Sequence, residues 1–199
     1  MIEDKIINKV EEKTEKIVEL LSELVRIPSL TGEEAKGQGF VASFLSSLGL
    51  EVDKWEPDIK ELFDKYPVVA QYPTHWEHDL ILPYENLPTY ESLVESKKID
   101  ILNYIGRSNV VGTLKGEGGG KSLILNGHID TVTVEPYNEW THDPFGAEIN
   151  DGTMYGRGVS DMKAGVIAGL IALECLIDLK VTLRGDVLFQ SVVNEEHSG

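Results

Sequence analysis

The feature that most constrains the fold is residues 162–179, which would form a helix that is apolar on nearly every side. A helix with no polar face is buried in a protein core or a membrane. Its purely apolar part, residues 164–173, is ten residues long, whereas a membrane-spanning helix needs about 20. The sequence therefore predicts a buried core helix and no segment that crosses a bilayer.

Strand-like segments lie on both sides of this helix. Residues 122–128 are apolar and β-branched, and residues 185–193 form a short apolar run typical of an inner strand. A third strand is expected over 109–114, paired with 122–128 through the glycine-rich turn 116–120. Strands that alternate with helices favour an α/β fold.

The N-terminal part predicts two helices and a strand. Near-helical spacing of apolar residues indicates one amphipathic helix over 4–26, which Pro28 ends. A second helix ends at Gly49 and is followed by a strand over 50–55. A small hairpin is expected over 147–155.

Residues 56–107 differ from the rest of the chain. They contain five of the eight prolines and show no sustained periodicity, which indicates an irregular insertion. Within it, His75 and His78 could be proposed as a metal-binding pair. No convincing helix brings the two rings onto one face, so exposed surface histidines are the simpler interpretation.

Composition excludes several classes of function. The chain has 34 acidic and 18 basic residues, a net charge of −16 and no basic cluster, which argues against nucleic-acid binding. The first residues alternate charged and apolar side chains and lack the order of a secretory signal, so a cytoplasmic location is expected. The single Cys175 lies on the apolar helix and is predicted to be a core residue.

Polar side chains that could carry chemistry follow the predicted strands. His128 and Asp130 are two residues apart, so both can point to one side if the strand continues. This pair fits a metal-binding imidazole with a carboxylate that orients it. A hydrogen-bonded pair that closes a strand-to-loop turn is equally consistent with the spacing.

Two further acidic groups lie at element ends. Asp161 stands where the apolar helix begins; it could cap that helix or bridge two cations with its two oxygens. Glu195 and Glu196 follow the last strand with no basic neighbour, an unfavourable pair unless a cation or shared proton offsets the repulsion. In an extended segment one would reach a metal while the other faces a bound water; a solvated strand end is the alternative.

Taken in order, these motifs resemble a known family: Gly127-His128-Ile129-Asp130, then Trp140 with Asp143-Pro144-Phe145, then Gly156-Arg157-Gly158 through Lys163, then Glu195-Glu196. Val25 to Ser29 also resembles an N-terminal hallmark of that family. The family is the co-catalytic zinc hydrolases, which includes acetylornithine deacetylase, succinyl-diaminopimelate desuccinylase, aminoacylase and glutamate carboxypeptidase. The resemblance implies a three-layer αβα sandwich around a mixed, largely parallel sheet.

The resemblance also implies a role for each site residue. His128 would bind one metal ion, Asp161 would bridge two, and Glu196 would bind the second. Glu195 would be the general base, and Asp130 would orient His128. A cis peptide bond is expected between Asp161 and Met162.

The implied activity is hydrolysis of an amide bond in an N-acyl amino acid by a metal-activated water. The cofactor would be two divalent ions, zinc by family expectation, with cobalt or manganese also compatible with these ligands. A dipeptidase or carboxypeptidase of the same family is an alternative, and a non-catalytic binding module is an alternative from another class. A serine hydrolase is disfavoured because no Gly-x-Ser-x-Gly motif occurs.

Family members are about twice as long as these 199 residues. Residues 1–199 are therefore expected to be the N-terminal part of a catalytic domain, without its C-terminal part and without the smaller dimerisation domain of a homodimeric parent. Weak metal binding and poor turnover are expected of this segment alone. His142 and His197 lie near the proposed site and could replace missing ligands, although neither matches a ligand position of the family.

Overall fold

The computed structural model describes residues 2–65, 90–95 and 104–197 of the chain. His75 and His78 lie outside the described residues. The helices are α1 (Ile2–Glu12), α2 (Thr14–Val25), α3 (Ala35–Ser47), α4 (Ile59–Lys65), α5 (Tyr90–Glu95) and α6 (Ala164–Asp178). The strands are β1 (Glu51–Trp55), β2 (Asn109–Leu114), β3 (Leu123–His128), β4 (Glu148–Asn150), β5 (Thr153–Tyr155) and β6 (Val187–Val192).

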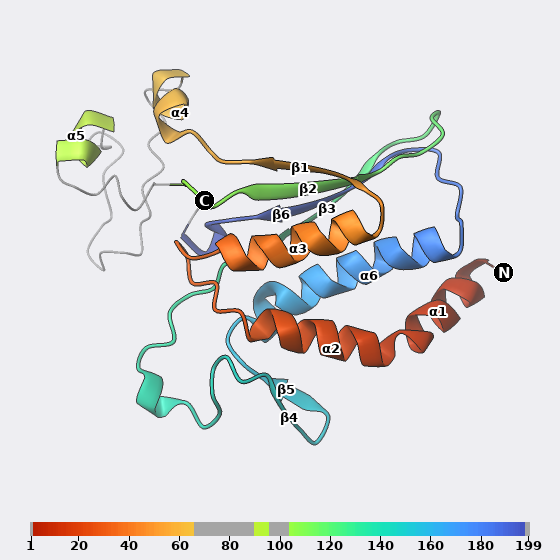
Figure 1. Ribbon diagram of the computed structural model, residues 1–199, viewed down its shortest axis with the longest axis horizontal. Helices are drawn as coiled ribbons and strands as arrows, with labels where there is room; N and C mark the ends of the chain where they lie inside the picture. The colour runs from red at the N-terminus through yellow and green to blue at the C-terminus, as the bar shows by residue number, and fades with distance from the viewer. Residues whose placement is uncertain (1, 66–89, 96–103, 198–199) are drawn as a thin grey trace.

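Four strands form the main sheet in the order β1-β2-β6-β3. β1 with β2 and β2 with β6 are antiparallel, and β3 with β6 is parallel. The predicted mixed α/β sheet is confirmed, although the parallel pairing among the described strands is confined to β3 and β6. Figure 1 shows this sheet above a layer formed by α1, α2, α3 and α6.

The predicted pairing of residues 109–114 with 122–128 is wrong, because β6 lies between these two strands. The glycine-rich turn itself explains the difference. Its backbone N–H groups at Glu117 and Gly120 donate to the carbonyls of Leu183 and Arg184, the residues that lead into β6. A side chain at Gly116 would lie 2.5 Å from the Gly185 carbonyl oxygen, so glycine lets the two backbones approach. The turn therefore guides β6 into the space between β2 and β3.

The core lies between the sheet and the helices. α3 packs on β1 and β2, α6 packs on β3 and β6, and α1 and α2 pack on α6. The predicted apolar helix is confirmed as α6, whose buried residues include Leu170 and Leu173, both 0% exposed. Cys175 is buried in the same core, as expected.

The single helix predicted over 4–26 is wrong, because the chain breaks at Lys13 into α1 and α2. The break turns Lys13 towards α6, where its ammonium lies 3.0 Å from Glu174 and 2.7 Å from Asp178. Lys16 contacts the same Glu174 carboxylate at 2.6 Å. Tertiary ion pairs thus fix a bend that the local apolar spacing does not show.

The remaining elements follow the expectations closely. The predicted second helix, the strand after it and the small hairpin are present as α3, β1 and β4-β5. The segment 56–107, predicted to be irregular, includes the short helices α4 and α5. No helix in the described part of the chain is long and apolar enough to cross a membrane.

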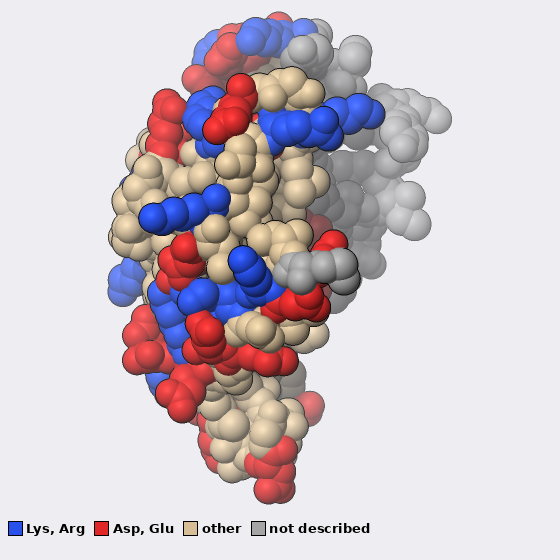
Figure 2. Space-filling model, turned by 90° about the vertical axis from the view of Figure 1, so that its right-hand side faces the viewer, with Lys and Arg blue, Asp and Glu red and all other residues tan. Residues whose placement is uncertain are grey.

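The end of the molecule drawn in Figure 2 carries intermixed charges. Blue lysine and arginine side chains alternate with red aspartate and glutamate side chains, and the described residues on this face form no continuous basic surface. Phosphate backbones are bound through clustered lysine and arginine. This face therefore lacks the charge pattern of a nucleic-acid interface.

Candidate metal centre

His128 is the last residue of β3, and its side chain is 4% exposed. Its Nδ1 lies 3.0 Å from the backbone carbonyl oxygen of Asp130 and 3.6 Å from a carboxylate oxygen of the same residue. These contacts hold the ring so that Nε2 points away from Asp130. An imidazole oriented in this way presents one free nitrogen as a ligand.

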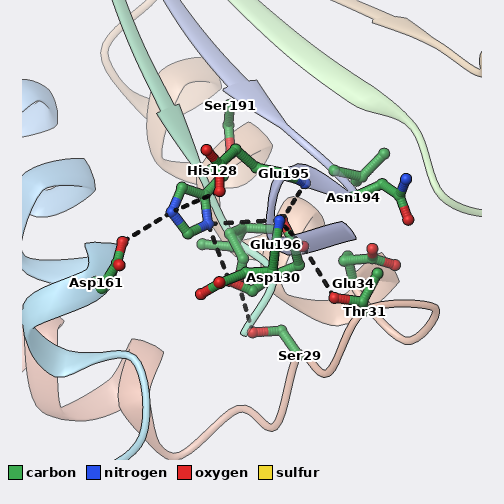
Figure 3. Close-up of polar contacts among 12 residues, drawn as sticks. Ser29, Thr31, Glu34, His128, Asp130, Asp161, Ser191, Asn194, Glu195 and Glu196 are labelled. Carbon is green, nitrogen blue, oxygen red and sulfur yellow. Dashed lines mark hydrogen bonds and ion pairs between the residues drawn. The ribbon is translucent and has the colours of Figure 1, made fainter. Parts of the chain in front are cut away.

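Asp161 approaches that nitrogen from the other side. It lies in a kinked turn, Val159–Lys163, that follows the left-handed Gly158 and precedes α6, and its own backbone is non-helical, with φ of −128° and ψ of 100°. One carboxylate oxygen lies 3.0 Å from His128 Nε2 (Figure 3). α6 begins without a side-chain cap, so Asp161 does not cap it. The Asp161–Met162 peptide bond is cis, as the resemblance implied.

Glu195 and Glu196 open a 3₁₀ turn, Glu195–His197, immediately after β6. The extended arrangement assumed from the sequence is therefore wrong. A 3₁₀ turn has three residues per turn, so neighbouring side chains still point about 120° apart. One Glu195 oxygen lies 3.7 Å from His128 Nε2.

Asp130 ties this turn to the ring. Its two carboxylate oxygens accept the backbone N–H groups of Glu195 and Glu196, each at 3.0 Å. The Thr31 hydroxyl donates to it as well, at 3.0 Å. Figure 3 shows Asp130 below His128, with Thr31 on its far side. The carboxylate therefore connects three segments that are far apart in the sequence.

His128, Asp161 and Glu196 form a potential metal-binding group. One donor atom from each residue lies within 4.8 Å of the other two. One imidazole and two carboxylates are ligands that zinc and similar divalent ions accept. The donor set present here therefore fits a divalent metal ion.

The electrostatics of the site favour a cation. Burial alone would lower the pKa of His128, but hydrogen bonds to Asp130 and Asp161 raise it to about 9. Burial would raise the pKa of Asp130, but bonds from His128 and from the N–H groups of Glu196 and Glu195 hold it below its ordinary value. Burial and the neighbouring carboxylates raise the pKa of Glu196. Positive charge is thus stabilised at the ring, where a metal ion would replace the proton.

Of the two further histidine candidates, His142 lies outside the group, and only the backbone of His197 is described. His142 Nδ1 contacts Glu148 at 2.9 Å, its ring stacks on Tyr155, and it is not part of the metal-binding group found among the described residues. The backbone of His197 ends the 3₁₀ turn. Arg157 lies over the ring of Trp140, whose indole N–H bonds to the nearby carbonyl of Val134, so these residues contact their own loop.

The structure adds residues that the sequence did not single out. Thr31 contacts Asp130, and Ser29 donates to the Ile129 carbonyl at 2.7 Å. Glu34 and Arg107 form an ion pair at 2.7 Å beside the end of β6. Ser29 ends the Val25–Ser29 hallmark and Thr31 lies two residues after it, so the hallmark was a usable signal for this segment. Glu34 and Arg107 are 73 residues apart and carry no local pattern.

A pocket of about 570 Å³ opens beside the site. Its wall includes Glu195, Trp55, Ile59, Tyr104 and Asn126. The pocket lies between the sheet and the start of α4, and it combines aromatic and aliphatic side chains with a few polar groups, as small-molecule sites do.

The fold and the donor group together define an α/β domain with a candidate metal centre. Human carnosine dipeptidase 1 shares the fold, with a TM-score of 0.66 and 18% sequence identity over 96% of this chain and 34% of that one. At this identity the likeness concerns the fold alone.

Sequence comparison gives the family. Residues 124–199 match the model of peptidase family M20/M25/M40. The chain is 32% identical to N-formyl-4-amino-5-aminomethyl-2-methylpyrimidine deformylase of Bacillus subtilis, over 94% of this chain and 34% of that protein. It is 36% identical to succinyl-diaminopimelate desuccinylase of Polynucleobacter necessarius, over 45% of this chain and 24% of that protein.

Residues 124–199 therefore place this part of the chain in peptidase family M20/M25/M40. This finding confirms the family resemblance seen in the motifs. The chain spans about a third or less of the length of these curated relatives.

Proposed function

We propose that residues 1–199 supply the N-terminal part of the catalytic domain of a metal-dependent amide hydrolase. The observation that carries this proposal is the meeting of His128, Asp161 and Glu196 within 4.8 Å, with a Glu195 oxygen 3.7 Å from the same ring. His128 and Glu196 would hold separate ions, and Asp161, whose side chain is 76% exposed, would bridge them. Zinc fits this set, as do cobalt and manganese.

Bound metal would supply a Lewis acid that polarises an amide carbonyl and acidifies water. Glu195 would act as the general base. Its carboxylate takes one proton from the attacking water, whose oxygen bonds to the carbonyl carbon. When the C–N bond breaks, Glu195 returns that proton to the leaving amine. Asp130 would hold the ring of His128 and the turn that carries Glu195.

The substrate class we propose is an N-acyl amino acid or related amide with a small acyl group. Support comes from the deformylase and the desuccinylase described above, both more than 30% identical, which are named for removal of formyl and succinyl groups. A dipeptidase is the less favoured alternative, because that likeness concerns the fold. We further propose a cytoplasmic homodimer, with the remaining ligands and substrate contacts in the part of the family domain beyond these residues.

Metal content tests the site directly. The chain and its Asp161→Ala variant are dialysed against dilute chelator, reloaded with Zn²⁺ and analysed for bound metal. Asp53→Ala, at an exposed aspartate of β1, is the matched control. We expect the chain and the control to bind zinc equally and Asp161→Ala to bind less than either. Equal zinc content in all three proteins would show that Asp161 is not a metal ligand.

Turnover tests the reaction. In the protein that carries the complete family domain, release of amine from formyl, acetyl and succinyl amides is compared with release from dipeptides. We expect Glu195→Gln to lower kcat by about 10²–10⁴-fold while metal content is unchanged. Unchanged kcat in this variant would refute the role of Glu195 as the base.

A further inference from the structure

The turn that carries the two glutamates depends on one unusual backbone conformation. Asn194 has φ of +67° and is 3% exposed. Asparagine tolerates this left-handed region better than most residues. This conformation ends β6 and turns the next two N–H groups towards Asp130. A contact that fixes the conformation of Asn194 therefore also fixes the backbone positions of Glu195 and Glu196.

Arg107 contacts the side chain of Asn194. Its Nη2 donates to the Asn194 side-chain oxygen at 3.3 Å. The same guanidinium makes a two-point ion pair with Glu34, Nε to Oε2 and Nη2 to Oε1, both at 2.7 Å. Tyr104 lies against its face, 4.7 Å from ring centre to guanidinium carbon. A planar guanidinium that makes two hydrogen bonds to one carboxylate has a fixed orientation.

Burial makes this arrangement informative. The Glu34 side chain is 0% exposed and that of Arg107 is 6% exposed. A buried ion pair is weak as a source of stability, because the desolvation of both charges offsets their attraction. The ion pair instead fixes an orientation. Glu34, just before α3, holds the Arg107 guanidinium so that it contacts Asn194, the residue before Glu195.

We propose that Arg107 is a positioning residue, which sets Glu195 and Glu196 through the side chain of Asn194. Glu34 in turn fixes the direction of Arg107. The glutamate turn is thus held at two points, by Asp130 at its N–H groups and by Arg107 at Asn194. The assignment of the glutamates to metal and base rests on the proposed function; the positioning itself rests on the contacts.

The main obstacle to a test is that Arg107→Met leaves a buried, unpaired Glu34 and can unfold the protein. The double variant Glu34→Gln with Arg107→Met removes both charges and avoids this. Asn194→Gly keeps the left-handed backbone and deletes the contact, while Asn194→Asp keeps an acceptor for Arg107. The matched control is Lys115→Met with Asp186→Asn, an exposed ion pair at the other end of the sheet.

Two measurements are made on each variant. The first is Co²⁺ affinity, from the visible absorption of the bound ion. The second is amide hydrogen exchange of Glu195 and Glu196 in metal-free protein, with amides of β6 as internal reference. Urea unfolding checks that each variant is folded.

We expect the double variant and Asn194→Gly to bind Co²⁺ at least about tenfold more weakly. Exchange of the two glutamate amides should become at least about tenfold faster while the β6 amides keep their protection. Asn194→Asp and the control should resemble the wild type in exchange.

Wild-type exchange of the glutamate amides in the folded double variant would overturn the proposal and leave the ion pair a structural feature. If the wild type binds no Co²⁺, the proposed function fails, and the exchange data still decide whether Arg107 positions the turn.

Discussion

Asp130 is the junction of the site. Its carboxylate accepts hydrogen bonds from Thr31, Glu195 and Glu196, and it lies 3.6 Å from the ring of His128. The side chain is 0% exposed, so a lost bond would leave a buried donor without a partner. One residue thus sets both the direction of the imidazole and the position of the glutamate turn.

We expect Asp130→Asn to weaken Co²⁺ binding by about 10–100-fold, because the amide can accept these N–H groups with only one oxygen. Unfolding stability should fall by about 1–3 kcal/mol. Thr31→Val, which removes a single donor, should have a smaller effect on both. Visible absorption and urea unfolding measure the two quantities, and wild-type metal affinity in Asp130→Asn would contradict the expectation.

Gly158 sets the backbone path before Asp161, and Gly118, in another turn, provides a matched control. Both have positive φ, +76° and +96°, but an added Cβ meets Thr131 at 2.5 Å only at Gly158, while Gly118 has open space. We expect Gly118→Ala to cost about 1–2 kcal/mol of unfolding free energy. Gly158→Ala should cost more and also weaken metal binding, since Asp161 lies three residues later. Equal losses by urea denaturation would show that the contact with Thr131 is readily relieved.

The bend between α1 and α2 depends on ion pairs with α6. Glu174 accepts from both Lys13 and Lys16, and its side chain is 11% exposed. Burial alone would raise the pKa of Glu174, but the bonds from Lys16 and Lys13 hold it below its ordinary value of 4.5. Its contribution to stability is therefore complete above that pH and is lost as the pH falls through the lowered pKa.

We expect Glu174→Gln to reduce the free energy of unfolding by about 1–3 kcal/mol at pH 7. The difference from the wild type should shrink as the pH falls below about 4.5. Glu12→Gln, at an exposed carboxylate paired with Lys9, is the control and should change stability by less than about 1 kcal/mol. Urea unfolding from pH 7 to pH 4 tests this, and a difference that grows on acidification would contradict it.

The elements that the sequence predicts well are those with a strong local signal. α6 is apolar on all sides, and β3 and β6 are short apolar runs. His128 at the end of β3 and Asp161 just before α6 could therefore be located together with these elements. The bend at Lys13 and the partner of β2 have no local signal. They are set by Glu174, 161 residues from Lys13, and by a turn that contacts Leu183.

The positioning contacts were the least predictable part of the site. Glu34 and Arg107 are ordinary charged residues in the sequence, and only the fold shows that they are buried together. The metal-binding donors, in contrast, follow strand ends in a recognisable order. The residues proposed to bind metal could therefore be located from the sequence, while the residues that hold them in place required the structure.

In the described part of the chain, the long helices cover one face of the main sheet. The long helices lie beneath the sheet in Figure 1, and among the described strands β3 pairs with β6 alone. Leu123 and Ile124 on β3 are each 54% exposed. An exposed apolar edge strand favours association with other chains.

We expect this chain to self-associate, and Ile124→Lys to suppress that association, because a charged side chain blocks pairing at a strand edge. Sedimentation velocity over a range of concentrations measures the effect. Ile149→Lys, at an exposed isoleucine of the β4-β5 hairpin, controls for added charge. A wild-type chain that sediments as a monomer at every concentration would contradict the expectation.

The strand order has a consequence for how the protein is made. Among the described strands of the main sheet, β6 is synthesised after β2 and β3, yet it lies between them, and it ends three residues before Glu195. While the ribosome is still adding residues 181–186, β3 lacks β6, its partner among the described strands, and Glu195 and Glu196 have not been synthesised. Residues 187–196 then join β2 to β3 and bring the glutamates to His128. During translation, the glutamates therefore cannot reach His128 before β6 has joined these two strands.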